Sequence, residues 1–194
     1  MMLELPPQVA PQWLPRLRLC CLWLLMGLLP LQLFAAPPNA EYKLKAALVY
    51  KLSKFVEWPA PSRDDKPGSF GICVLGEDVF GSALDALEQR KTAGQTVRIR
   101  RFAQSESIGD SCQVVFISKS KRAFMGAILQ KLAGRPILTL GDTEGFAEQG
   151  GIIEFTRGKK RIGFLINLES ARRSGLKIAA PLLDLATVLD SPDN

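Results

Sequence analysis

The sequence predicts an α/β domain with a mostly parallel sheet flanked by helices and a local antiparallel hairpin near the C-terminus. Short, nearly all-apolar runs at 70–75, 113–118 and 136–140 are typical of strands that are covered on both faces. Helical segments alternate with these runs, which is typical of a parallel sheet with helices on its faces. Two later strands are joined by a short, glycine-containing connection, which predicts the hairpin.

The first predicted element is a helix over residues 41–58, ended by Pro59. Its buried stripe is expected from the apolar side chains at helical spacing, which are Leu44, Leu48, Leu52 and Phe55. Lys45 is the one charged residue that intrudes on this side. An amphipathic helix of this kind suits a membrane surface or a sheet. We expect it to pack on the domain's own sheet.

The middle of the chain alternates strands and helices. A helix over 82–90 should carry Leu84 and Leu87 inward, and a strand over 96–102 should place Arg98 and Arg100 on one face. The strand over 113–118, a helix over 121–132 and the strand over 136–140 follow. Residues 141–143 then turn into a short helix that ends at Gly150-Gly151.

The hairpin strands are predicted at 152–155 and 161–166, and two helices close the chain. Pro181 suits the first turn of the last helix. The side chains expected to face inward from that helix are Leu182, Leu185, Ala186 and Leu189.

Residues 1–36 have the pattern of a secretory signal peptide. Arg16 and Arg18 precede an apolar run over 19–34, and the small residues Ala35 and Ala36 follow it. An uncleaved N-terminal anchor is the alternative. We therefore expect an exported protein whose mature part, residues 37–194, is a single domain.

The composition restricts the chemistry. The chain contains no histidine, which excludes Ser-His-Asp and Cys-His nucleophilic sites and nearly every catalytic zinc site. Glycine-rich phosphate-loop motifs are also missing. Of the four cysteines, Cys73 and Cys112 lie in the predicted mature domain, where an even pair in an oxidising compartment predicts a disulfide. Two separately buried thiols are the alternative. We expect no enzymatic activity, no metal and no cofactor.

Two kinds of residue are candidate contacts for a partner or ligand. Asp142 follows a predicted parallel strand, at the edge where open sheets bind ligands, although it also suits a helix cap. The candidate basic contacts are Arg98, Arg100, Arg157, Lys159 and Lys160. They form either solvated faces or, if they converge, a site for an acidic partner or a phosphorylated ligand. The net charge of +6 includes no long run of like charges, and we expect no nucleic-acid partner.

An ordered set of segments resembles the YfiR family, once catalogued as a domain of unknown function. The segments are 41–50 (EYKLKAALVY), 54–59 (KFVEWP), 73–76 (CVLG), 112–118 (CQVVFIS), 138–142 (LTLGD), Phe146, 150–153 (GGII), 164–167 (FLIN), 175–178 (GLKI) and 182–186 (LLDLA). Each segment is short, but together they cover the whole predicted mature chain in the right order. The resemblance also implies that Cys73 and Cys112 form a disulfide, whereas a second family pair nearer the C-terminus has no counterpart here.

The resemblance implies a periplasmic regulatory protein. Members of this family are small Gram-negative periplasmic proteins, and the best-understood type holds an inner-membrane diguanylate cyclase inactive by binding its periplasmic region. Sequestration by an outer-membrane lipoprotein releases this inhibition, raises cyclic-di-GMP and promotes biofilm formation. For this chain the resemblance therefore implies the periplasmic region of a cyclase or similar sensor as partner. An outer-membrane lipoprotein is a possible second partner, and the chain could also form a homodimer. The alternative is a periplasmic small-ligand-binding protein without a cyclase target.

Overall fold

The computed structural model describes residues 40–59, 68–92, 94–158 and 162–189, with only the backbone of Glu106. The predicted signal peptide lies outside these residues, and so do two of the candidate contacts, Lys159 and Lys160. The account that follows concerns the described residues alone.

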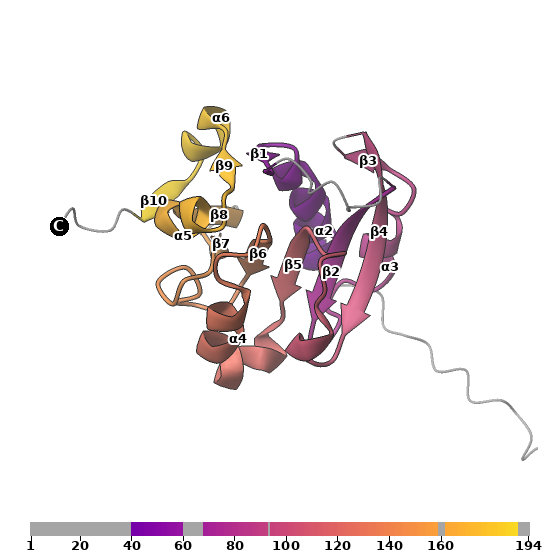
Figure 1. Ribbon diagram of the computed structural model, residues 1–194, viewed down its shortest axis with the longest axis horizontal. Helices are drawn as coiled ribbons and strands as arrows, with labels where there is room; N and C mark the ends of the chain where they lie inside the picture. The colour runs from indigo at the N-terminus through magenta and orange to yellow at the C-terminus, as the bar shows by residue number, and fades with distance from the viewer. Residues whose placement is uncertain (1–39, 60–67, 93, 159–161, 190–194) are drawn as a thin grey trace, which may run out of the picture. The chain divides into compact units, whose positions relative to one another are not determined.

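Most of the strands form one eight-stranded sheet in the order β10-β8-β7-β6-β5-β2-β4-β3, and Figure 1 shows this sheet from β10 at the left to β4 at the right. Parallel pairing joins β2 to β4 and β5, β5 to β6, β6 to β7, and β8 to β10. The pairs β3–β4 and β7–β8 are antiparallel. The strands are β2 (Ser69–Leu75), β3 (Lys91–Thr92), β4 (Gln95–Phe102), β5 (Val114–Ile117), β6 (Leu138–Gly141), β7 (Ile153–Arg157), β8 (Ile162–Asn167) and β10 (Thr187–Leu189). The predicted fold class is confirmed, including the hairpin near the C-terminus.

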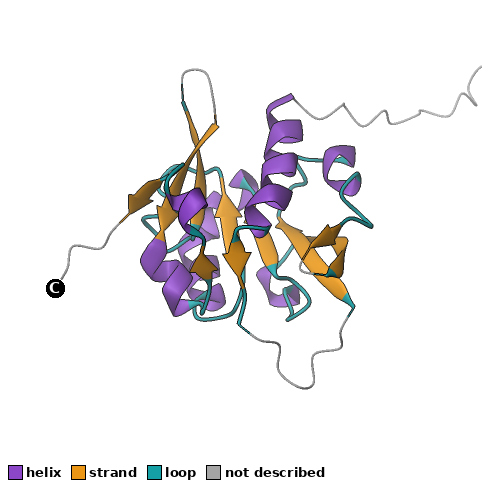
Figure 2. Ribbon diagram, turned by 90° about the horizontal axis from the view of Figure 1, so that it is seen from above, coloured by secondary structure: helices purple, strands orange, loops and turns teal. Residues whose placement is uncertain are grey.

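Helices flank this sheet, as Figure 2 shows with helices and strands in separate colours. They are α2 (Ala40–Ser53), α3 (Ser82–Asp85), α4 (Met125–Leu132), α5 (Leu168–Arg173) and α6 (Ala180–Leu183). The 3₁₀ segments η1 (Ser105–Ser107) and η2 (Lys119–Phe124) complete them. A separate antiparallel pair joins β1 (Val56–Glu57) to β9 (Lys177–Ile178). No described helix is both long enough and apolar enough to cross a membrane.

The central strand β2 is buried on both faces, because its side chains alternate between two core clusters. Phe70, Ile72 and Val74 pack in the cluster that includes residues of α2 and α3. Cys73 and Leu75 pack in the cluster that includes the inward side chains of α4. Every residue of β2 after Ser69 is therefore buried, which explains its continuous apolar sequence.

The Cys73–Cys112 disulfide is present and confirms the predicted pairing. It joins the middle of β2 to the turn before β5, with the two Cα atoms 5.8 Å apart. Both cysteines are almost completely buried, so the bond is part of the core.

The predicted inward face of the first helix is only partly correct, because Leu52 is buried as predicted but Leu44 and Phe55 are exposed. In α2, Leu44 is 50% exposed, whereas Lys45 is buried beside Ala46, Val49 and Leu52. The helix is rotated relative to the predicted stripe because Lys45 has acidic partners inside the domain. The helix also ends earlier than predicted, and Val56 belongs to β1.

Other helices also differ from the predicted boundaries. Only residues 82–85 of the segment 82–90 are α-helical, although Leu84 and Leu87 are buried as predicted. Residues 143–150 form turns and bends in place of the expected short helix. In the last predicted helix Leu182 is buried, but Leu185 is 75% exposed and Leu189 lies in β10.

Candidate binding groove

A groove of about 890 Å³ lies beside the carboxyl ends of β5 and β6. One wall comes from the start of α2, another from η2, and a third from the β7–β8 hairpin. The turn after β6 completes it. The lining residues are Glu41, Leu44, Lys45, Lys119, Arg122, Asp142, Thr143, Glu144, Glu154, Phe155, Thr156, Arg157, Gly158 and Ile162.

The parallel sheet explains why these residues meet. The strands β5 and β6 pair in parallel, with Ile117 opposite Gly141 at their carboxyl ends. The residues that follow these strands therefore leave the sheet at the same edge, and they include Lys119 and Asp142. Open α/β sheets bind ligands at this edge, so the groove occupies a place suited to binding.

Asp142 lies at the centre of a buried polar cluster. Its Oδ2 atom is 2.5 Å from Nζ of Lys45, accepts a hydrogen bond from the Tyr42 hydroxyl at 3.0 Å and lies 3.8 Å from Nζ of Lys119. Burial and the neighbouring Asp142 carboxylate together raise the pKa of Tyr42 to about 12. Asp142 thus orders the side chains of α2 against the turn after β6, and it caps no helix.

Phe146 fixes the turn that carries Asp142. Its ring is fully buried between Gly141 and Gly151, and a Cβ atom on either glycine would overlap the ring. Glycine is therefore needed on both sides because of close packing. The Glu154 carboxylate accepts a hydrogen bond from the backbone N–H of Ala147, which anchors the same turn to β7.

The hairpin wall is joined to α2 by an ion pair between Arg157 and Glu41. Glu41 also lies 2.7 Å from Nζ of Lys45. The hydrogen bond from Lys45 is the largest cause that lowers the pKa of Glu41, and burial opposes it. Arg157 of the predicted contacts therefore lies in the groove with Asp142.

The other two described candidates, Arg98 and Arg100, do not line this groove. Both lie on β4, and their shared face is confirmed by the register, which places them beside Gly71 and Cys73 of β2. Arg98 is exposed, whereas Arg100 donates a hydrogen bond to the backbone carbonyl of Ser111 at 2.8 Å. The predicted basic contacts do not all converge on one site.

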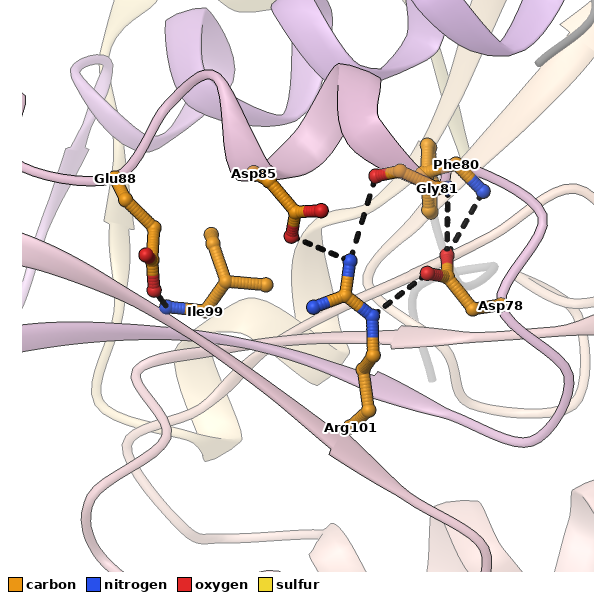
Figure 3. A network of polar contacts seen from close by, with 7 residues as sticks. All are labelled: Asp78, Phe80, Gly81, Asp85, Glu88, Ile99 and Arg101. Carbon is orange, nitrogen blue, oxygen red and sulfur yellow. Dashed lines mark hydrogen bonds and ion pairs between the residues drawn. The ribbon is translucent and has the colours of Figure 1, made fainter. Parts of the chain in front are cut away.

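A third arginine of β4, Arg101, has a structural role that Figure 3 shows. Its guanidinium contacts Asp78 at 2.6 Å and Asp85 at 2.7 Å, and these contacts hold the segment that includes α3 on β4. Burial raises the pKa of Asp78, but Arg101 and the backbone N–H groups of Phe80 and Gly81 outweigh this effect and lower the pKa overall. The guanidinium of Arg101 is therefore bonded within the fold and is not a candidate contact for a partner.

Sequence reasoning missed three cations of the groove, which are Lys45, Lys119 and Arg122. Lys119 and Arg122 belong to the segment KSKR directly after a buried strand, and that position could have identified them. The acidic partners of Lys45 became visible only in the folded chain. Within the described residues no group of three or more Cys, Asp or Glu side chains is arranged to hold a metal ion. The groove, with its exposed cations beside apolar side chains, is suited to binding a ligand or a partner.

Comparison with known protein families shows which family the chain belongs to. A family model described as YfiR/HmsC-like matches residues 42–187, which includes nearly all of the described residues. The match confirms the resemblance found in the sequence.

Proposed function

The chain belongs to the YfiR/HmsC-like family, and we propose that it is a periplasmic regulatory protein that binds the periplasmic region of an inner-membrane diguanylate cyclase or similar sensor and inhibits it. The family match over residues 42–187 is the observation that carries this proposal. In this role the protein lowers cyclic-di-GMP and restrains biofilm formation. An outer-membrane lipoprotein would relieve the inhibition by sequestering the protein.

Two further observations support a regulatory role in the periplasm. The buried Cys73–Cys112 disulfide suits an oxidising compartment. The absence of histidine from the whole sequence removes the commonest catalytic bases and nucleophile partners. The first observation favours a periplasmic location, and the second favours a protein that acts by binding.

The mechanism is a population shift of the target. Binding favours the inactive arrangement of the cyclase only to the extent that the protein binds this arrangement more tightly than the active one. A change from 1:99 to 99:1 requires about 5.5 kcal/mol of differential binding free energy.

Export is part of the proposal. We propose cleavage of the signal peptide near Ala35 or Ala36, so that residues 37–194 act in the periplasm as one domain. Intact-mass measurement of the protein from a periplasmic fraction tests this step. A full-length mass, or a protein confined to the cytoplasm, would contradict it.

The regulatory role is tested by measuring cellular cyclic-di-GMP. Deleting the gene should raise its level, and expressing the exported protein should lower it. The matched control is the same chain without residues 1–36, which stays in the cytoplasm and should have no effect. No change on deletion or expression, in a strain that contains active membrane cyclases, would refute inhibition of a cyclase.

A second candidate function is capture of a small ligand. The observation that favours it is the groove of about 890 Å³ at the sheet edge where open α/β sheets bind ligands. Thermal stabilisation of the purified protein by extracts of small molecules tests this role without reference to a cyclase.

A further inference from the structure

We propose that the groove binds a small organic anion with an apolar body. The proposal rests on the second candidate function, ligand capture, and does not depend on a cyclase target. Carboxylates, sulfonates and phosphate monoesters share the chemistry that the groove would recognise, which is a negative group attached to a hydrophobic part.

Positive charge is available in the groove. Arg122 forms no hydrogen bond or ion pair with any residue that the structure describes, and it is exposed. Lys119 is 55% exposed, and among the residues that the structure describes its side chain pairs only with Asp142, at 3.8 Å. Both cations extend from η2, so an anion placed beside η2 can contact both. Arginine is well suited to this contact because its planar guanidinium donates two parallel hydrogen bonds to a carboxylate or phosphate.

The acidic side chains of the groove are largely engaged within the protein. The Oδ2 atom of Asp142 pairs with Lys45 and Tyr42, whereas its Oδ1 atom has no hydrogen-bond partner among the described residues but is buried away from the groove surface. The Glu154 carboxylate accepts a hydrogen bond from the backbone N–H of Ala147. Glu41 lies between Lys45 and Arg157. Of the acidic lining residues, Glu144 alone forms no hydrogen bond or ion pair with a described residue. The charge that remains free for a ligand is thus mainly positive, which favours an anion.

The apolar part of the ligand has a surface to contact. Leu44 is 50% exposed on α2 although it lies within a helix that packs on the core, and it lines the groove. Phe155 and Ile162 of the hairpin contribute to the same lining. The volume of about 890 Å³ lies within the range of about 300–1,000 Å³ typical of small-molecule sites. A ligand that covers Leu44 would remove an exposed apolar side chain from water.

Calorimetric titration of the purified full protein with related probes tests the chemistry. The probes are 1-naphthoate, 1-naphthalenesulfonate and 1-naphthyl phosphate, with 1-naphthamide as the neutral match and acetate and sulfate as anions that lack the apolar body. We expect at least one naphthyl anion to bind about tenfold more tightly than 1-naphthamide, a difference of about 1.4 kcal/mol, because hydrogen bonds between charged groups are stronger than those of a neutral amide. Acetate and sulfate should bind more weakly than the best naphthyl anion. The probe that binds most tightly then shows whether the natural ligand carries a carboxylate, a sulfonate or a phosphate group.

Variants test the location. Arg122→Gln should weaken binding of the best probe about tenfold, and Leu44→Ser should weaken it as well, while both variants keep the thermal stability of the parent because these side chains are exposed. Arg98→Gln is the matched control, since Arg98 is exposed on β4 and lies outside the groove. Binding unaffected by Arg122→Gln, equal binding of 1-naphthoate and 1-naphthamide, or no binding of any naphthyl anion would overturn the proposal. None of these results would alter the cyclic-di-GMP measurements.

Discussion

Replacing Asp142 with alanine should destabilise the domain by about 3 kcal/mol. The substitution leaves Lys45 charged and buried, with its side chain only 4% exposed. Breaking a buried ion pair by removing one partner costs about 3–5 kcal/mol. We expect the lower end of this range because Glu41 stays 2.7 Å from Nζ of Lys45 and is itself 25% exposed, so that it keeps part of the charge compensated.

The assays are urea denaturation and thermal denaturation at pH 7, both followed by circular dichroism. A loss of about 3 kcal/mol in a domain of this size should lower Tm by about 6–12 °C. The slope of the unfolding free energy with urea should stay unchanged, because the folded state keeps its core. The double variant Lys45→Met with Asp142→Ala serves as the control, since it removes both charges together and is compared with the two single variants Lys45→Met and Asp142→Ala. It should be more stable than the sum of the two single variants predicts, which gives a measurable coupling energy.

The reasoning would be refuted by an Asp142→Ala variant within about 0.5 kcal/mol of the parent, the range of an ordinary surface substitution. Additive single and double variants would refute it as well. Either result would mean that Lys45 reaches solvent when its partner is removed.

Three further predictions follow from the core and the groove. Gly151→Ala should cost about 2–3 kcal/mol in urea denaturation, because its methyl group would overlap the fully buried ring of Phe146. Replacing Cys73 and Cys112 together with alanine should cost about 4 kcal/mol in the chain-entropy model, because their separation of 39 residues closes a long loop. Stability should fall as the pH rises from about 10 to about 12, because Tyr42, with its pKa raised to about 12, keeps its proton in the folded state after an unfolded tyrosine has lost it.

Each of these predictions has a control. Gly109→Ala should leave stability nearly unchanged, since a Cβ atom there meets nothing within 4 Å, and equal losses at both glycines would contradict the packing argument. Thiol titration of the unfolded parent should detect no free thiol at the cysteine pair before reduction. Tyr42→Phe should reduce the loss of stability at high pH, and an unchanged loss would exclude Tyr42 as its cause. Tyr50 serves as an internal reference in ultraviolet titration, because the hydrogen bond with Lys54 lowers its pKa.

The sequence predicted the longer strands well because their apolar runs reflect burial on both faces. The strands β1, β3, β9 and β10 were missed, since two or three residues are too few to establish a period. The face of α2 was predicted only in part, for a different reason. Periodicity treats a lysine as exposed, but Lys45 is buried against Asp142, which lies 97 residues further along the chain. A contact of this kind becomes visible only when the sheet brings the two segments together.

The candidate site was predicted only in part for the same reason. Asp142 was found because it follows a buried strand, and the same rule could have identified Lys119 and Arg122 after β5. Which arginines are exposed and which are bonded within the fold could be seen only in the structure. On β4 alone, Arg98 is exposed, Arg100 bonds to a carbonyl and Arg101 lies between two carboxylates, although all three have the same side chain.

The packing of Phe146 between two glycines has a consequence for how the groove can diversify. Any change at this ring, or at Gly141 or Gly151, alters the core and the position of Asp142 together, so stability constrains this side of the groove. The opposite side is less constrained, because Leu44 and Arg122 are exposed and can change with little effect on folding. Related chains can therefore acquire new ligand preferences through α2 and η2 while the turn after β6 keeps its geometry.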